Sequence, residues 1–468
     1  MAGYRGAQYH YCSYCSRCWH HSGCRPPGSA TAAGCWAPAS AWSYGAKTRR
    51  RTEFDTGLSQ KMNQSTALRE RFHRLSRLLI DQAAIWRPVP FSLPALPWES
   101  QQPALAAALG RLSDEHCAAL ETDQQALVRW LTEYIPALAQ ISAVDTVAAF
   151  SADRTDYPAG FERDIPGRKW RQVSAFAACL EHMGGPVVEW CAGKAHLGRA
   201  IAQRFSTPVT ALEWNAELCN RGSELSRRLQ LDVTLRHCDV LSAAAAGELR
   251  QARHAVALHA CGDLHRRLIE TVIAQATASL DLSPCCYHLT GATHYQPYSQ
   301  AARDSGLALN RDDCRLAVQE TVTAAASNRR RRQQKSAWRL GFDALQRRLR
   351  GVDDYLPVPS LPESAFDTSF ADFCGRVAAL KQLTLPHRVD WPYYQHLGWL
   401  RQARVSRMEL PRHAFRRALE LWLVVDRALY LAECDYHVQV GTFCDRQLTP
   451  RNLMIRAHRQ PGLVAGPA

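Results

Sequence analysis

The sequence predicts an α/β fold built around a mostly parallel sheet, and two patterns in the chain support this prediction. From residue 186 to residue 285, short apolar segments of strand length alternate with helical segments, as in doubly wound parallel sheets. Nearer the C-terminus, two strand-like segments, Tyr436–Phe443 and Asn452–Ala457, are separated by a turn at Thr449-Pro450. We therefore expect a Rossmann-like sheet of seven strands that ends in an antiparallel hairpin, which a plain dinucleotide-binding fold lacks.

The limits of the individual elements follow from the same patterns. Parallel strands are expected at Pro186–Cys191, Val209–Glu213, Val233–His237, His254–His259 and Leu280–Cys285. Helices are expected before, between and after them, at Lys169–Met183, Leu197–Phe205, Ala216–Leu229, Leu264–Ala278 and Arg412–Glu433. Ligands of open parallel sheets bind beyond the carboxyl ends of the strands, so the residues that follow these strands are the candidates for a site.

The chain is expected to divide into five segments. We predict a disordered or spurious extension at 1–61, a helical region at 62–150, the core of the sheet domain at 165–291, a basic helical insertion after the fifth strand at 292–410, and the final helix and hairpin at 411–460. Residues 1–52 contain no Asp, Glu, Leu, Ile, Val or Phe, so they offer nothing to a core-facing helix or strand. One interpretation places the true start of the protein at Met62. The alternative is a metal knuckle with ligands from Cys12, Cys15, Cys18, His20, His21 and Cys24.

Composition narrows the classes of partner. The formal net charge of +14 suits a polyanion such as RNA or DNA, although an Arg-rich, GC-biased genome explains the same excess. No run of 18 or more apolar residues occurs, so neither a transmembrane helix nor a membrane partner is expected. Beyond residue 35 the cysteines are scattered, mostly singly, and no signal peptide is recognisable, so we predict a cytoplasmic protein.

The segment VVEWCAGKAHLGRAIA has the features of a cofactor-binding turn between a strand and a helix. Gly193 permits the tight turn, and Ala195 and Gly198 keep side chains small near the ligand. In a dinucleotide enzyme the helix N-terminus would hold a pyrophosphate. S-adenosyl-L-methionine (SAM) has no phosphate, and the carboxylate of Glu189 suits its ammonium group, directly or through water.

Two further acids lie at the ends of the next strands. Glu213 is placed to accept hydrogen bonds from both ribose hydroxyls, and Asp239 from the adenine amino group. A Gly-rich turn followed by two such acids favours SAM over a nicotinamide cofactor. The predicted SAM-binding residues are Glu189, Ala192, Gly193, Lys194, Ala195, His196, Gly198, Glu213, Asp239 and His259.

Four short motifs, AGKAHLGR, LHACGDL, SPCCYHL and LTPRN, resemble those of a group of methyltransferase-like proteins that includes the glutathione-S-transferase-C-terminal-domain-containing protein. The resemblance covers roughly residues 165 to 460 and implies a class I, SAM-dependent methyltransferase fold without a known substrate. The family pattern matches Gly193, Lys194, His196, Gly198, His259, Cys261, Gly262, Asp263, Cys285, Cys286, Tyr287 and His288. This chain departs from it at Ala195, where the family usually has Gly, and a methyl group there is expected to weaken or reshape SAM binding.

The acceptor is expected to meet the methyl group between the ends of the fourth and fifth strands. Asp263 or His259 is placed there to orient the acceptor or take its proton. Cys285 or Cys286 offers a nucleophile for covalent attack on a pyrimidine ring, with Cys261 nearby. Asp263, His259, Cys285 and Cys286 are therefore the candidate catalytic residues. One alternative is that the cysteines only pack at strand ends, and another is a metal site of Cys261, Cys285, Cys286, His259 and His288. The spacing matches no standard metal motif, and we predict no metal ligands.

Three functions remain in competition. The first is a SAM-dependent methyltransferase that acts on RNA or protein. The second is a non-catalytic SAM-fold module that binds a nucleic acid or a protein, which Ala195 and the lack of a standard acceptor motif favour. The third is an NAD-dependent oxidoreductase, which the hairpin and Asp239 disfavour. The basic run Arg329–Arg332 either binds phosphates or forms a solvated helix face.

Overall fold

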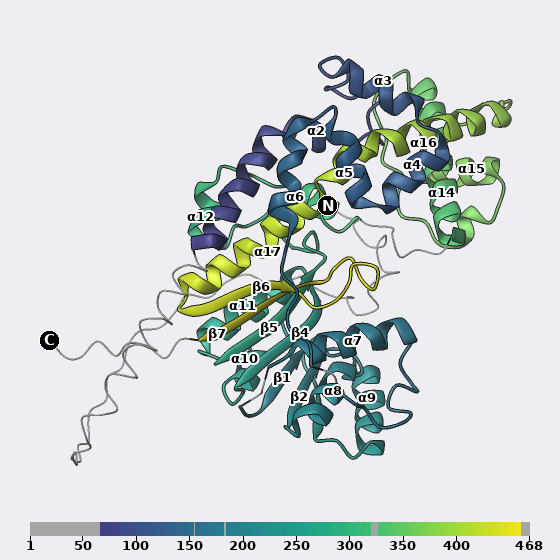
Figure 1. Ribbon diagram of the computed structural model, residues 1–468. Coiled ribbons are helices and arrows are strands. Elements are labelled where there is room, and N and C mark those ends of the chain that lie inside the picture. Colours follow the sequence, from purple (N-terminus) through teal and green to yellow (C-terminus); the bar gives the residue numbers. More distant parts are fainter. Residues whose placement is uncertain (1–65, 154, 182–183, 320–325, 460–468) are drawn as a thin grey trace, which may run out of the picture.

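The computed structural model describes residues 66–153, 155–181, 184–319 and 326–459 (Figure 1). The predictions for residues 1–61, including the start at Met62 and the metal knuckle at Cys12 to Cys24, lie outside the described residues. Within those ranges, no helix combines the length and the apolar character that crossing a membrane requires.

A seven-stranded sheet forms the centre of the molecule, in the order β3-β2-β1-β4-β5-β7-β6. Its strands are β1 (Val187–Trp190), β2 (Val209–Glu213), β3 (Val233–His237), β4 (His254–Cys261), β5 (Ser279–Cys285), β6 (Tyr436–Thr442) and β7 (Leu453–Arg459). Strands β1 to β5 run parallel, and β7 pairs antiparallel with both β5 and β6. The predicted mixed sheet with its C-terminal hairpin is confirmed, and this order is that of a class I methyltransferase.

Helices cover both faces of the sheet, because successive strand residues face opposite sides. Val187 on β1 packs into a core with α7 (Gly167–Cys179) and α8 (His196–Phe205). Its neighbour Val188 packs into the larger core on the other face, beside α11 (Asp263–Ala274). Helix α9 (Ala216–Arg228) contacts β3, and the short α10 (Ala244–Leu249), which the sequence pattern did not indicate, contacts α11.

The N-terminal helices pack on the two helices that precede β6. Residues 66–81 are helical. They are followed by α2 (Ala83–Trp86), α3 (Pro103–Arg111), α4 (Asp114–Thr122), α5 (Gln124–Thr132), η1 (Pro136–Leu138) and α6 (Ala139–Asp145). Helices α2 to α5 contact α16 (Trp391–Ala414), and α6 contacts α17 (Arg416–Glu433). The indole of Trp422 on α17 donates to the Ser76 hydroxyl at 2.9 Å and ties the first helix to this layer.

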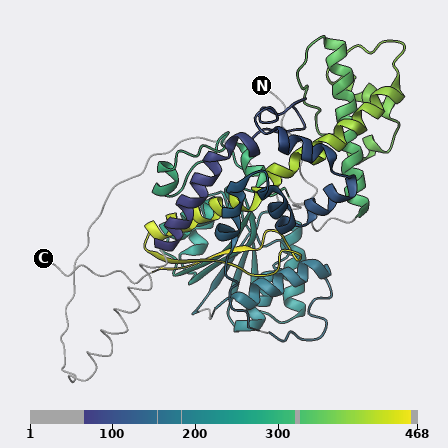
Figure 2. The same cartoon turned by 45° about the horizontal axis from the view of Figure 1, so that its top comes forward.

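The segment after β5 builds a lobe of its own at the far end of α16 (Figure 2). Two short helices, α12 (Gln300–Asp304) and α13 (Arg311–Leu316), stay on α17. The lobe itself consists of α14 (Ala326–Arg350), η2 (Glu363–Phe366), α15 (Phe370–Leu380) and α16. Its core is aromatic, with Trp338, Phe342, Phe366 and Phe373 packed together. The single final helix predicted at Arg412–Glu433 is interrupted, because α16 extends to Ala414 and Phe415 separates it from α17.

Candidate active site

The loop after β1 is held in a left-handed backbone conformation at three positions. Cys191, Gly193 and Ala195 have φ angles of 58°, 61° and 52°. Only Gly adopts such angles without strain, so the non-glycine residues are fixed here by their surroundings. Ala195 is fully buried at the N-cap of α8, and its side chain faces Gly198. The departure from the resembled family therefore lies at a position where glycine is the less strained residue.

Glu189 lies beneath this loop and is almost fully buried. One of its carboxylate oxygens accepts a hydrogen bond from the Gly198 backbone N–H at 2.8 Å. A side chain at Gly198 would begin 2.6 Å from the same oxygen, so the small residue is required for this contact. Burial raises the pKa of Glu189 to about 8, which favours the neutral acid near pH 7 in the unliganded protein. A bound ammonium group would reverse that preference.

A hydrogen bond joins the loop after β1 to the end of β2. The Gly193 backbone N–H donates to one oxygen of Glu213 at 2.9 Å, and the Asn215 backbone N–H donates to the other at 2.9 Å. Burial raises the pKa of Glu213, while these backbone donors act in the opposite direction. Each carboxylate oxygen has a second lone pair, so Glu213 retains acceptor capacity for hydroxyl groups. The link fixes two predicted cofactor residues relative to each other.

The next turn of α8 contains a buried basic pair. The Nδ1 atom of His196 lies 2.6 Å from an Arg199 guanidinium nitrogen, and Arg199 also donates to the Lys194 carbonyl at 2.7 Å. Burial, reinforced by the nearby cations, lowers the pKa of His196 to about 2, and burial lowers that of Arg199 to about 10. His196 is therefore neutral and accepts from Arg199. His196 is 4% exposed, and its predicted contact with SAM stays a prediction. The neighbouring Ala192, also predicted to bind SAM, is buried in the same loop.

Asp239 lies where the sequence predicts it, after β3 and exposed to solvent. One carboxylate oxygen accepts from the Leu241 backbone N–H at 3.0 Å. Leu241 also borders a cleft of about 310 Å³ whose walls include Asp263, Arg266, Thr290 and Gln296. The cleft thus connects the loop after β3 with the loops after β4 and β5, which is the edge where the acceptor is expected.

The ends of β4 and β5 bring the predicted catalytic residues together. Asp263 begins α11, and its carboxylate accepts from the Gly291 backbone N–H at 2.7 Å. His259 has a φ of 62°, and its Nε2 atom lies 3.3 Å from the Gln172 amide oxygen on α7. Gly262 allows the loop after β5 to approach closely, since a Cβ atom there would lie 1.8 Å from the Leu289 carbonyl oxygen. Which of these side chains acts on a substrate stays a prediction.

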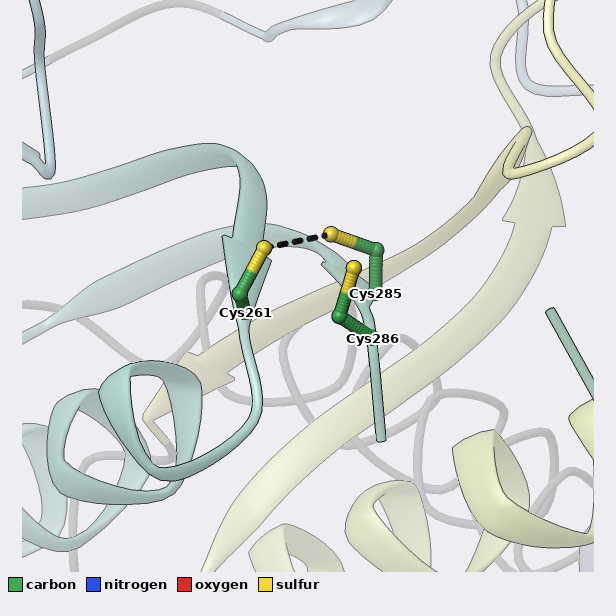
Figure 3. Close-up of side chains that lie close together, drawn as sticks. All are labelled: Cys261, Cys285 and Cys286. Carbon is green, nitrogen blue, oxygen red and sulfur yellow. Dashed lines mark hydrogen bonds between the residues drawn. The ribbon is translucent and has the colours of Figure 1, made fainter. Parts of the chain in front are cut away.

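Three cysteine sulfurs converge at the same strand ends (Figure 3). The Sγ atoms of Cys261, Cys285 and Cys286 all lie within 4.8 Å of one another, and those of Cys261 and Cys285 are 3.2 Å apart. Hydrogen bonds from the other two thiols hold the pKa of Cys286 below its ordinary value. Burial lowers the pKa of the neighbouring His288 to about 4, so that imidazole is neutral.

A buried polar network behind the site escaped the sequence patterns. Arg427 on α17 donates to Nε2 of His265 at 2.9 Å, and Nδ1 of His265 therefore carries the proton and donates to the Ala260 carbonyl at 3.0 Å. The guanidinium also packs over the rings of Tyr287 and Tyr298, at 5.0 and 4.8 Å. The sequence feature that could have indicated this network is an arginine within a strongly apolar helix, because such a charge is rarely buried without partners.

The basic run at the start of α14 is partly neutralised by acids of the same lobe. Arg331 donates to Glu363 at 2.9 Å and to Asp367 at 2.6 Å, and Lys335 also pairs with Glu363. Arg330 remains exposed. A hollow of about 530 Å³ beside it is lined by Asn328, Arg330, Arg331, Gln333, Gln334, Trp338, Gln395 and Trp399. The basic run therefore borders this hollow and does not form an evenly solvated helix face.

Comparison with known proteins assigns a class to the sheet domain. Residues 168–292 match the model of a family described as a methyltransferase domain, so this part of the chain is a methyltransferase domain. The match includes the loops that contain Gly193, Glu213, Asp239 and the three cysteines. The comparison with curated proteins gave no match.

Solved structures that resemble the chain include methyltransferases of low identity. They include a geranyl diphosphate methyltransferase in complex with SAM (17% identity, 29% of this chain, 60% of that chain, TM-score 0.23). Others are the geranyl diphosphate C-methyltransferase from Streptomyces coelicolor (12%, 34%, 63%, 0.19) and coclaurine N-methyltransferase (14%, 51%, 62%, 0.21). The chain spans less than two thirds of each of these proteins. With TM-scores this low, the fold assignment depends on the strand order described above.

Proposed function

We propose that the protein transfers a methyl group from SAM to RNA. The observation that supports SAM best is the hydrogen bond from the Gly193 N–H to Glu213, which joins the loop of a methyltransferase domain to an acid at the end of β2. SAM supplies an electrophilic methyl group when bound. The protein's own residues hold it: Glu189 suits its ammonium group, Glu213 the ribose hydroxyls and Asp239 the adenine amino group.

The fit of these residues to SAM follows from charge and space. Gly193, with a φ of 61°, lets the loop direct its backbone N–H at Glu213, and Gly198 lets the helix pack directly against the Glu189 carboxylate. Glu189 is a buried acid next to this loop whose charge a ligand cation would stabilise.

RNA is favoured as the acceptor by the hollow on the insertion lobe. Arg330 offers an exposed cation, and Trp399, which is 40% exposed, offers an aromatic face for a base. Phosphate attraction and base stacking together are the usual means of holding single-stranded nucleic acid. The net charge of +14 acts in the same direction at long range.

The experiment is methyl transfer from isotopically labelled SAM by the full chain, with total RNA and total protein offered separately. Label should enter RNA with the wild type and with Glu217→Gln, an exposed control on α9, and should be lost with Glu213→Gln. SAM and NAD titrations accompany it. Label in protein alone would replace RNA by a protein acceptor, SAM binding without transfer to either would indicate a non-catalytic module, and NAD binding alone would indicate an oxidoreductase.

A second pair of variants tests the RNA surface. Arg330→Glu with Trp399→Ala should lower RNA methylation at least tenfold and reduce its salt dependence, while SAM affinity stays unchanged. Arg348→Glu is the matched control, because Arg348 is exposed on the same helix but does not line the hollow. If Arg348→Glu lowered RNA methylation as much, the effect would come from the change in net charge and not from the hollow.

A further inference from the structure

The three-cysteine cluster has a geometry that strand packing alone does not produce. Cys285 is the last residue of β5 and Cys286 follows it, and in a continued strand their side chains would point to opposite faces. Their Sγ atoms nevertheless lie within 4.8 Å of each other and of Cys261 (Figure 3). Cysteines that serve only as small apolar fillers have no reason to direct their sulfurs at one point.

The backbone departs from regular strand geometry at the two positions that create this convergence. A bulge between Leu258 and Ala260 on β4 inserts His259 and brings Cys261 level with Cys285 on β5. Cys286 has a φ of 47°, in the left-handed region, and this turns its side chain back toward the other two. Left-handed conformations at non-glycine residues are costly and persist mainly at functional sites. The cluster is therefore built by specific features of both strands.

We propose that Cys261, Cys285 and Cys286 bind a soft divalent cation, with zinc as the expected ion. Two thiolate sulfurs bound to one tetrahedral zinc ion, each about 2.3 Å from it, lie about 3.8 Å apart. The Sγ atoms of Cys261 and Cys285 are 3.2 Å apart and all three sulfurs lie within 4.8 Å of one another, so a zinc ion would require only small side-chain adjustments. At 3.2 Å, Cys261 and Cys285 are too far apart to form a disulfide bond.

The surroundings suit a three-thiolate ion. Zinc with three thiolates has a net charge of −1, and the guanidinium of Arg451 acts electrostatically on Cys286. Arg451 is fixed by a hydrogen bond from its guanidinium to the Val318 carbonyl at 2.5 Å. No nitrogen of His259 or His288 belongs to the group of mutually close ligand atoms. Three protein ligands leave the fourth position for water or a substrate atom, as in catalytic rather than structural zinc sites.

The site lies at the ends of β4 and β5, where the acceptor is expected, but the proposal does not depend on methyl transfer. Metal content is measured without SAM or an acceptor, so failure of one proposal leaves the other intact. Soft thiolate ligands select zinc over magnesium or calcium, which prefer oxygen.

The experiment uses the full chain with the five N-terminal cysteines replaced by serine, so that Cys12, Cys15, Cys18, Cys24 and Cys35 contribute no metal. This protein, purified under reducing conditions, should contain one zinc per chain and should give the intense absorption of a tetrahedral thiolate site with Co²⁺. Cys286→Ser should bind zinc at least tenfold more weakly in competition with a chromophoric chelator. Cys314→Ser, which removes another buried thiol outside the cluster, should bind like the parent.

Two readouts separate loss of metal from loss of fold. An unchanged far-UV circular dichroism spectrum shows that the Cys286→Ser variant is folded. In the parent protein, a chelator should increase alkylation of Cys286, because a metal-bound thiolate is protected. The proposal is wrong if the parent and Cys286→Ser contain the same amount of zinc, if the chelator leaves alkylation unchanged, or if mass spectrometry finds a disulfide within the cluster.

Discussion

Replacing Glu189 by Gln tests whether the buried acid beneath the loop is the partner of the SAM ammonium group. The glutamine keeps an acceptor for the Gly198 N–H but cannot ionise. With a pKa of about 8, Glu189 is about nine-tenths protonated at pH 7, and removing its proton costs about 1.4 kcal/mol there. If SAM binds the ionised form, binding at pH 7 releases about 0.9 proton from this group, and affinity rises about tenfold from pH 6 to pH 7.

The assay is calorimetric titration of SAM in buffers of different ionisation enthalpy, from pH 6 to pH 8.5. The SAM amino group also titrates in this range, so the quantity of interest is the wild-type proton release minus that of Glu189→Gln. Equal proton release by both proteins would refute the assignment of Glu189 to the ammonium group. It would leave the carboxyl as a neutral acid that only braces the loop.

The same raised pKa has a consequence for the unliganded protein. The folded state binds more protons than the unfolded state between the ordinary value of 4.5 and about 8. The stabilising contribution of Glu189 is therefore present below pH 4.5 and is lost as the pH rises toward 8. Thermal unfolding should accordingly favour Glu189→Gln over the wild type increasingly as the pH rises, and SAM should reduce that difference.

Three further changes test the backbone and the core. Ala195→Gly should change the melting temperature by only a few degrees, because relief of about 1–2 kcal/mol of left-handed strain is offset by the entropy cost of glycine, about 0.5–1 kcal/mol, and by the loss of a buried methyl group, about 0.8 kcal/mol; a large shift in either direction would contradict this interpretation. Gly262→Ala should lower the melting temperature markedly, since its Cβ atom would lie 1.8 Å from the Leu289 carbonyl oxygen, while Gly247→Ala, with open space around it, should have little effect. Asp281→Asn should lower the free energy of unfolding by about 3 kcal/mol at pH 7 by removing a buried partner of arginine and histidine. Although burial opposes ionisation, these partners hold the pKa of Asp281 below 3.8, so its contribution to stability is lost as the pH falls. In urea titrations, the free energies of unfolding of the wild type and Asp281→Asn should therefore approach each other in acid.

The sequence was sufficient for the sheet and for the position of the loop after β1 because both depend on local patterns. Alternating apolar segments identified the strands, and Gly193 and Glu213 lie where these strands end. A metal site that includes Cys261, Cys285 and Cys286 was one open alternative, but the sequence could not establish that the three sulfurs converge. Strand periodicity would place Cys285 and Cys286 on opposite faces, and no sequence pattern predicts the left-handed φ of Cys286.

Contacts between distant segments could not be predicted from the sequence either. His265 and Arg427 are 162 residues apart, and their hydrogen bond forms only because α17 packs across the sheet. The pairing of Arg331 with Glu363 depends on how the insertion folds back on itself. Sequence reasoning could name such charges but could not assign their partners.

The arrangement of α16 and α17 gives the insertion lobe a physical connection to the strand ends. Phe415, which is fully buried, is the single residue between α16 and α17, so nearly continuous helix joins the lobe to the sheet domain. On α17, Arg427 fixes His265, and His265 fixes the carbonyl of Ala260, between His259 and Cys261. Helix α16 borders the basic hollow, and α17, which follows it directly, positions the strand end where we place the acceptor and the metal. Because a buried arginine with aromatic and imidazole partners has few alternative arrangements, the two ends of this connection are held in one relative orientation.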